Sequence, residues 1–252
     1  MVDALLSGSA GAGALADPGL TVAMHMSDGL VNAPTAAVFG LVAAMGLAIA
    51  ASRARADLDE RTAPMAGLVT AFVFAVQMIN FPILPGASGH LLGGALVAIL
   101  VGPWVGSLCI AIVLVVQALL FADGGLTALG TNITNMALVG TFTGYLVAYA
   151  LRRFAARSRP GLLVTSFVAA LINTVVASLA FVLEYAIGGS GGAGLSTVFA
   201  LMVGLHVLVG IGEGIITAAT VGAVAAVRPD LVHLLRGTRP AVTLRTPGEV
   251  RR

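Results

Sequence analysis

Seven apolar runs, separated only by short polar or glycine-rich segments, fill most of the chain between residues 33 and 227. Hydrophobic residues make up 58% of the 252 residues and charged residues only 10%, which is too little charge to cover a water-facing surface. A helix that crosses a bilayer needs about 20 apolar residues. We therefore predict an all-α, polytopic integral membrane protein with about seven transmembrane helices. The runs cover roughly residues 33–52, 65–80, 90–102, 104–122, 132–151, 162–187 and 195–227.

The number of spans depends on the third run, which is short for a transmembrane helix. Gly102 and Pro103 follow it and favour a tight turn before the fourth run. The alternative is to merge the third and fourth runs into a single helix, which lowers the number of spans to six.

The arginines decide between seven and six spans. All 13 basic residues are arginine, and they form three clusters, after the first, fifth and seventh runs. Basic residues concentrate in cytoplasmic loops. Seven spans with an external N-terminus place all three clusters in the cytoplasm, whereas six spans would divide them between the two sides. The clusters are Arg53, Arg55, Arg61; Arg152, Arg153, Arg157, Arg159; and Arg228, Arg236, Arg239, Arg245, Arg251, Arg252.

The chain divides into three predicted parts: an N-terminal extension over residues 1–23, which is untranslated or removed if Met24 is the first residue of the mature chain, a transmembrane domain over 24–227, and a cytoplasmic tail over 228–252. Cys109 is the only cysteine, which excludes a disulfide framework and a thiolate metal site. The net charge of +2 gives no reason to expect nucleic acid as a partner. Membrane lipid is the expected surrounding, and the plasma membrane the expected location.

The four histidines differ in their sequence context. His25 and His90 each lie where a predicted outer segment meets the start of a helix, and imidazole is the commonest metal ligand for nickel, cobalt, copper and zinc. The two could share one ion, or each could simply cap or pack a helix end. His233 lies in the tail and is expected to be a solvated surface residue.

The Met24-His25 step favours metal binding if Met24 is the first residue of the mature chain. A free α-amine, the next amide nitrogen and the imidazole of His25 can then close adjacent chelate rings, and His90 would complete a four-nitrogen set. Planar four-nitrogen sites suit Ni(II) and Cu(II), and Co(II) binds in related sites. If residues 1–23 stay attached, the amine is lost.

His206 and Glu213 lie seven residues apart, on one face of the last predicted helix. Ionisable residues inside a membrane are candidates for function, but this pair is equally consistent with a structural hydrogen bond. No H-E-x-x-H motif or nucleotide-binding G-x-x-x-x-G-K-[ST] motif is present. Glu184, near the outer end of the sixth run, is expected at the membrane interface.

Four blocks carry a resemblance to a known family: MHMSDGLVNAP, INFPILPGASGHLLGG, QALLFADGGLTALGTNITNM and LHVLVGIGEGIIT. From Met24 to about Val227 the chain resembles the CbiM/NikM family, the substrate-specific membrane (S) components of energy-coupling-factor (ECF) cobalt and nickel ABC transporters. The resemblance implies a seven-helix bundle that binds a divalent metal from outside. It implies the amine of Met24, the amide and imidazole of His25, and His90 as ligands.

The resemblance also implies partners: a transmembrane coupling (T) subunit, two ATPase (A) subunits that hydrolyse ATP, and a small CbiN/NikN-like membrane subunit. We therefore expect a non-enzymatic capture component that imports Co(II) by preference, for cobalamin synthesis, with no permanently bound cofactor. Nickel(II) uptake is the alternative within the family. An intramembrane enzyme using His206 and Glu213, and a passive metal channel, are more remote alternatives.

Overall fold

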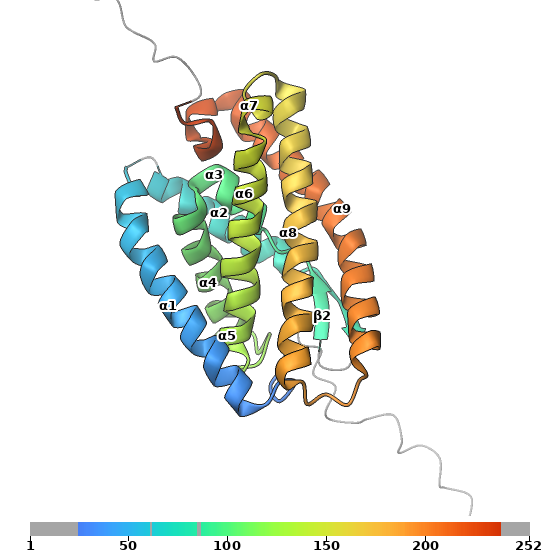
Figure 1. Cartoon of the computed structure of the whole chain (residues 1–252). Helices are drawn as coiled ribbons and strands as arrows, with labels where there is room; N and C mark the ends of the chain where they lie inside the picture. The colour runs from blue at the N-terminus through green and yellow to red at the C-terminus, as the bar shows by residue number, and fades with distance from the viewer. Residues whose placement is uncertain (1–24, 61, 85–86, 238–252) are drawn as a thin grey trace, which may run out of the picture.

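The computed structural model describes residues 25–60, 62–84 and 87–237, and its long helices pack side by side in one bundle (Figure 1). In the described part, five helical segments are long and apolar enough to cross a membrane, and a sixth apolar helix, α2, is shorter. The five are α1 (Ala33–Asp57), α4 (Pro103–Leu120), the continuous segment formed by α5 (Leu129–Asn132), η1 (Ile133–Gly140) and α6 (Thr141–Ala150), α8 (Arg159–Gly188) and α9 (Leu195–Val227). The shorter elements are α2 (Thr62–Gln77), α7 (Arg152–Ala155) and the 3-10 turns η2 (Pro229–Leu231) and η3 (His233–Leu235).

Two of the long helices begin where side chains cap the free backbone amides. The side chain of Asn32 accepts a hydrogen bond from the amide of Thr35 at the start of α1, at 3.0 Å. Ser158 accepts one from the amide of Gly161 at the start of α8, at 3.1 Å. A proline lies in the first turn of both helices, where its missing N–H costs nothing. Local sequence therefore sets these two helix starts.

The third apolar run differs from the expected short span. It forms only the eight-residue helix α3 (Gly94–Val101), about 12 Å long, which is too short to cross a hydrocarbon core of about 30 Å. An antiparallel hairpin of β1 (Asn80–Leu84) and β2 (Ala87–His90) precedes it and packs against α9. The two strands of the hairpin hydrogen-bond to each other. Backbone N–H and C=O groups of a non-helical segment within a membrane need such partners, because no water is available there. The predicted turn before α4 is confirmed, with Gly102 at a φ of 90°.

The outer surface of the bundle is apolar, whereas the ionisable side chains of Glu184, His206 and Glu213 lie inside. Leu41, Leu68 and Leu208 are each at least 65% exposed, whereas Glu213 is 2% exposed. Exposed apolar faces of this kind suit contact with lipid rather than water. This inside-out distribution confirms a multi-pass membrane protein.

The segments that carry the described arginines, namely the end of α1, α7, the start of α8 and the chain after α9, lie at one end of the bundle, the upper end in Figure 1. The guanidinium of Arg53 lies 5.7 Å from the ring centre of Trp104, beside the start of α4. Arg236 donates a hydrogen bond to the hydroxyl of Thr62 at the start of α2, at 2.8 Å. One-sided arginine placement agrees with the sequence argument, whereas the number of spans and the orientation stay predictions. Arg61 and the arginines after residue 238 lie outside the described residues.

The prediction of a solvated His233 is wrong. The turn that carries it packs against α3, and Val232, Leu234 and Leu235 are all buried. The imidazole of His233 is half-buried, with its ring centre 6.2 Å from that of Tyr145. The apolar V-H-L-L stretch explains why His233 is not solvated. Its valine and leucine side chains pack against the bundle, although the surrounding segment is rich in arginine and proline.

Candidate metal centre

The N-terminal segment before α1 lies inside the bundle and carries His25, which is 5% exposed, and Met26, which is 1% exposed. Asn132 holds this segment by both backbone groups of Met26. Its side-chain oxygen accepts from the Met26 amide and its side-chain nitrogen donates to the Met26 carbonyl, each at 3.0 Å. The amide of Gly125 donates to the same carbonyl, also at 3.0 Å. These bonds fix His25 in place.

A second attachment lies a few residues further along. The carboxylate of Asp28 accepts hydrogen bonds from the hydroxyl and the amide of Thr127, at 2.5 and 2.7 Å. The hydroxyl bond of Thr127 is the main reason why the pKa of Asp28 is lowered, although partial burial opposes it. The N-terminal segment is thus joined to the loop between α4 and α5 at two places.

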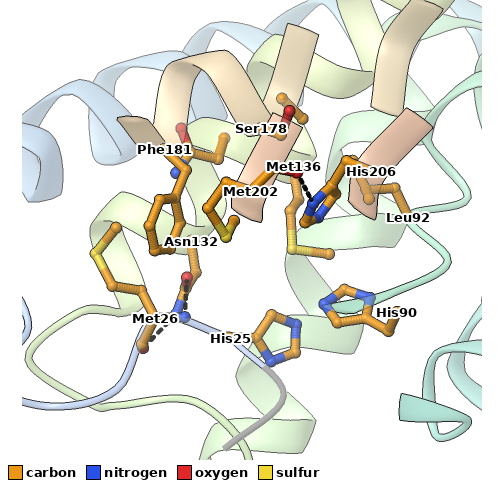
Figure 2. Close-up of a pocket in the computed structure, with 12 residues that line it drawn as sticks. His25, Met26, His90, Leu92, Asn132, Met136, Ser178, Phe181, Met202 and His206 are labelled. Atoms are coloured by element: carbon orange, nitrogen blue, oxygen red, sulfur yellow. Dashed lines mark hydrogen bonds between the residues drawn. The ribbon is translucent and has the colours of Figure 1, made fainter. Parts of the chain in front are cut away.

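The imidazoles of His25 and His90 meet in the bundle interior. Their ring centres are 4.5 Å apart with an angle of 51° between the ring planes, and His90 is 4% exposed (Figure 2). His90 comes from the end of β2 and His25 from the N-terminal segment. Metal–nitrogen bonds are about 2 Å long, so imidazoles this close can bind a single ion.

Neighbouring groups set which ring nitrogens can act as ligands. Nδ1 of His90 lies 2.9 Å from the Leu91 carbonyl, so with the proton on Nδ1 the lone pair is on Nε2. Nδ1 of His25 lies 3.3 Å from a carboxylate oxygen of Asp123, and Nε2 of His25 is buried with no hydrogen-bond partner among the described residues. Carboxylates and carbonyls orient metal-binding imidazoles in this way. The sequence reasoning did not identify Asp123 or Asn132.

The two histidines line a cavity of about 40 Å³. That volume is enough for a small ion or a water molecule, which needs about 10–15 Å³. In the described residues, no three side chains of histidine, cysteine, aspartate or glutamate come together to hold a metal. Met24 lies outside the described residues. The cavity is lined by His25, Met26, His90, Leu92, Asn132, Asn135, Met136, Ala177, Ser178, Phe181, Met202 and His206.

Glu213, which the sequence left open between function and structure, holds the chain that follows His90. Its carboxylate accepts hydrogen bonds from the amides of Leu92 and Gly93 at 2.8 and 3.0 Å. The side chains of Asn173 and Thr174 on α8 donate to it at 3.0 and 2.8 Å. Four donors on one buried carboxylate connect α8, α9 and the start of α3. This favours the structural interpretation of Glu213.

His206 bonds elsewhere. Its Nδ1 lies 2.6 Å from the carbonyl of Met202, one turn earlier in α9, and its ring lines the cavity.

The prediction that Glu184 lies at the membrane interface is wrong: it is 1% exposed and accepts a hydrogen bond from Asn135 at 2.6 Å. The π-helical stretch η1 places Asn135 at the cavity, and such stretches are frequent at functional sites.

Comparison with known proteins gives the family of the chain. The model of the CbiM family, described as a cobalt uptake substrate-specific transmembrane region, matches residues 25–231. The chain belongs to the CbiM family. A putative fused nickel transport protein NikMN of Archaeoglobus fulgidus is 40% identical over 210 residues, covering 83% of this chain and 68% of that protein.

Other CbiM relatives extend the comparison. A cobalt transport protein CbiM of Sorangium cellulosum is 32% identical over 225 residues, covering 86% of this chain and 98% of that protein. A crystal structure of a truncated transition metal transporter superposes with a TM-score of 0.71 at 28% identity, covering 81% of this chain and 99% of that one. These relatives are named as nickel, cobalt or transition metal transport proteins, and the first two are similar to the chain over more than four fifths of its length.

Proposed function

We propose that this CbiM-family protein is the substrate-capture (S) component of an ECF-type ABC transporter that imports a divalent transition metal. The observation that carries the proposal is the 4.5 Å approach of the His25 and His90 rings in a buried cavity. His25 and Met26 of the N-terminal segment line that cavity and are both buried, so a captured ion would lie among buried side chains. The ion is the transported substrate and not a permanently bound cofactor.

The proposed ligands are the amine of Met24, the amide and imidazole of His25, and the imidazole of His90. Among the described residues no group of three histidine, cysteine, aspartate or glutamate side chains is arranged to hold a metal, which supports a set completed by other donors. The remaining ligands then come from backbone nitrogen beside His25. Removal of residues 1–23 supplies the free amine.

Binding by this set also requires a local rearrangement. An imidazole that closes a chelate ring with its own backbone amide uses Nδ1, the nitrogen nearer the backbone. Nδ1 of His25 faces Asp123 in this structure. Metal capture therefore exchanges the contact with Asp123 for a metal bond, and binding of the deprotonated amide releases a proton.

The proposed partners are a T subunit, two A subunits and a small CbiN/NikN-like membrane subunit. The 252 residues carry no nucleotide-binding motif, so ATP hydrolysis would be performed by separate subunits. Relatives from Archaeoglobus fulgidus and Lactiplantibacillus plantarum are named as fused NikMN and LarMN proteins, which supports a small CbiN/NikN-like partner. The arginine-rich end of the bundle is the proposed cytoplasmic end.

We propose Co(II) as the preferred ion, with Ni(II) as the second candidate. Relatives are named for both metals, and nitrogen ligands suit both. A competition experiment decides: the purified chain starting at Met24 is loaded with equimolar Co(II) and Ni(II), and bound metal is measured by mass spectrometry. A majority of cobalt is expected, and a majority of nickel would reverse the assignment.

The transport role is tested in cells that express the protein with and without its proposed ATPase subunits. Uptake of radioactive cobalt is expected only when all subunits are present. Uptake that does not depend on the ATPase subunits would instead indicate a passive channel. A His90→Ala variant serves as the control for capture, because it should abolish uptake while the assembled complex can still be purified.

A further inference from the structure

The inner wall of the metal cavity carries three potential ligands that the proposed capture site does not use. They are the imidazole of His206 and the thioethers of Met136 and Met202, all less than 8% exposed. Figure 2 shows the side chains of Met136 and Met202 extending into the same space as the ring of His206, next to His90. His206 lies 11 residues into α9, about 16 Å along the helix axis from its start.

The ring of His206 is held in the form that binds metals. Its Nδ1, at 2.6 Å from the Met202 carbonyl, donates its proton there, so Nε2 carries the lone pair. His90 has the same arrangement with the carbonyl of Leu91. A metal-binding histidine usually donates its other ring N–H to a carbonyl or carboxylate. A histidine inside a membrane is also costly, which makes a functional use the default interpretation.

The sulfur atoms add a second kind of ligand. Met202 lies one turn before His206 on the same face of α9, and Met136 comes from a different element, η1, that lines the same cavity. Thioethers are soft ligands that favour late transition metals over magnesium or calcium. Three unbranched methionines, with Met26, give this wall the freedom to adapt to an ion.

From this geometry we infer a second, inner metal position formed by His206 with Met136 and Met202, which accepts a borderline transition-metal ion from the His25–His90 site. The inference rests on the proposed function. The described residues do not bring three imidazoles together in one metal-binding group, so the ion occupies the two positions in turn. Transfer is a ligand exchange in which the ion stays divalent: bonds to the outer nitrogens break as bonds to Nε2 of His206 and to sulfur form.

The test removes the outer site and asks what remains. His25→Ala in the full protein, purified in detergent, is expected to retain weak Co(II) binding, and His25→Ala/His206→Ala is expected to bind at least tenfold more weakly. X-ray absorption of cobalt-loaded His25→Ala protein is expected to show a sulfur ligand. Adding Met136→Leu and Met202→Leu to the His25→Ala protein nearly conserves side-chain volume and should remove that sulfur signal.

Matched controls separate the two proposals. Met65→Leu changes a partly buried methionine outside the cavity and should leave the sulfur signal intact. If wild-type protein binds neither Co(II) nor Ni(II), the proposed function itself fails. If the wild type binds metal but the His25→Ala protein shows only nitrogen and oxygen ligands, and adding His206→Ala changes nothing, the inner position alone is overturned. Should the histidine double variant fail to fold, the leucine variants decide the outcome.

Discussion

The side chain of Asn132 pairs with both backbone groups of Met26, accepting from its amide and donating to its carbonyl at 3.0 Å. An asparagine at the start of a transmembrane helix thus binds the N-terminal segment as a neighbouring strand would. The result is that the residue adjacent to His25 cannot move without breaking two buried hydrogen bonds. Asn132 therefore links the fold of the bundle to the geometry of the metal site.

Replacing Asn132 should weaken metal binding without unfolding the bundle. Two buried hydrogen bonds contribute about 1–3 kcal/mol, so Asn132→Ala should raise the Kd for Co(II) by roughly ten- to a hundredfold. Asn132→Asp keeps the acceptor for the Met26 amide and loses the donor, so its affinity should fall in between. Isothermal titration calorimetry checks both. Equal affinities for wild type and Asn132→Ala would show that the segment is held by other contacts.

Loss of either imidazole should affect the metal far more than the fold. His90→Ala and His25→Ala are each expected to lower Co(II) affinity by at least about a hundredfold, because each removes a ligand from a preorganised site. His233→Gln, at the opposite end of the bundle, should bind cobalt as the wild type does. Metal content after gel filtration measures all three. A His90→Ala protein with wild-type cobalt content would contradict the site.

The sequence predicted the parts of this molecule that depend on local chemistry. The long spans follow from run length, because a bilayer accepts only apolar stretches of sufficient length. His25 and His90 stood out by residue type. Asn132 and Asp123 did not, since their partners Met26 and His25 lie 106 and 98 residues away in the chain. Such long-range contacts leave no pattern in a single sequence.

The hairpin was missed for a different reason. The segment before His90 is rich in proline, glycine and serine, which is typical of a loop. In the structure its backbone pairs with itself to form β1 and β2. Gly93 continues the chain with a φ of 78°, and an added Cβ there would meet Val73. Tertiary packing therefore decides the conformation of this segment.

The C-terminal turn should loosen as the solution becomes acidic. Burial lowers the pKa of His233, and nearby Arg236 lowers it further. A histidine with a lowered pKa in the folded state contributes stability that is complete above its unfolded value of about 6.5 and is lost as the pH falls through the folded value. The melting temperature of the wild type should thus fall more than that of His233→Gln between about pH 7.5 and pH 5.5. Parallel melting curves for the two proteins would contradict this.

The orientation can be tested by cysteine labelling in a Cys109→Ala background. Arg55 and Arg157 are exposed at the arginine-rich end, and Ser190 is exposed in the loop between α8 and α9. With the proposed orientation, a membrane-impermeant maleimide added to intact cells should label Ser190→Cys and leave Arg55→Cys and Arg157→Cys unlabelled. All three should react once the cells are opened. Labelling of Arg157→Cys from outside would reverse the topology.

The N-terminal residues allow the sharpest test of the ligand set. In a chain that starts at Met24 the α-amine is free, whereas in the 252-residue chain it is part of a peptide bond. Loss of one nitrogen from a chelate should lower affinity by about a hundredfold or more, since preorganised chelation supplies much of the binding energy. The short chain is therefore expected to bind Co(II) tightly and the long chain weakly, with N-terminal sequencing to verify each start.

Affinity of the short chain should also rise between mildly acidic and neutral pH, because binding displaces protons from nitrogen. A chain that starts at Met24 and carries an acetylated amine is the matched control, and it should behave like the long chain. Equal affinity in all three forms would remove the Met24 amine from the ligand set and leave His25 and His90 as the protein's contribution.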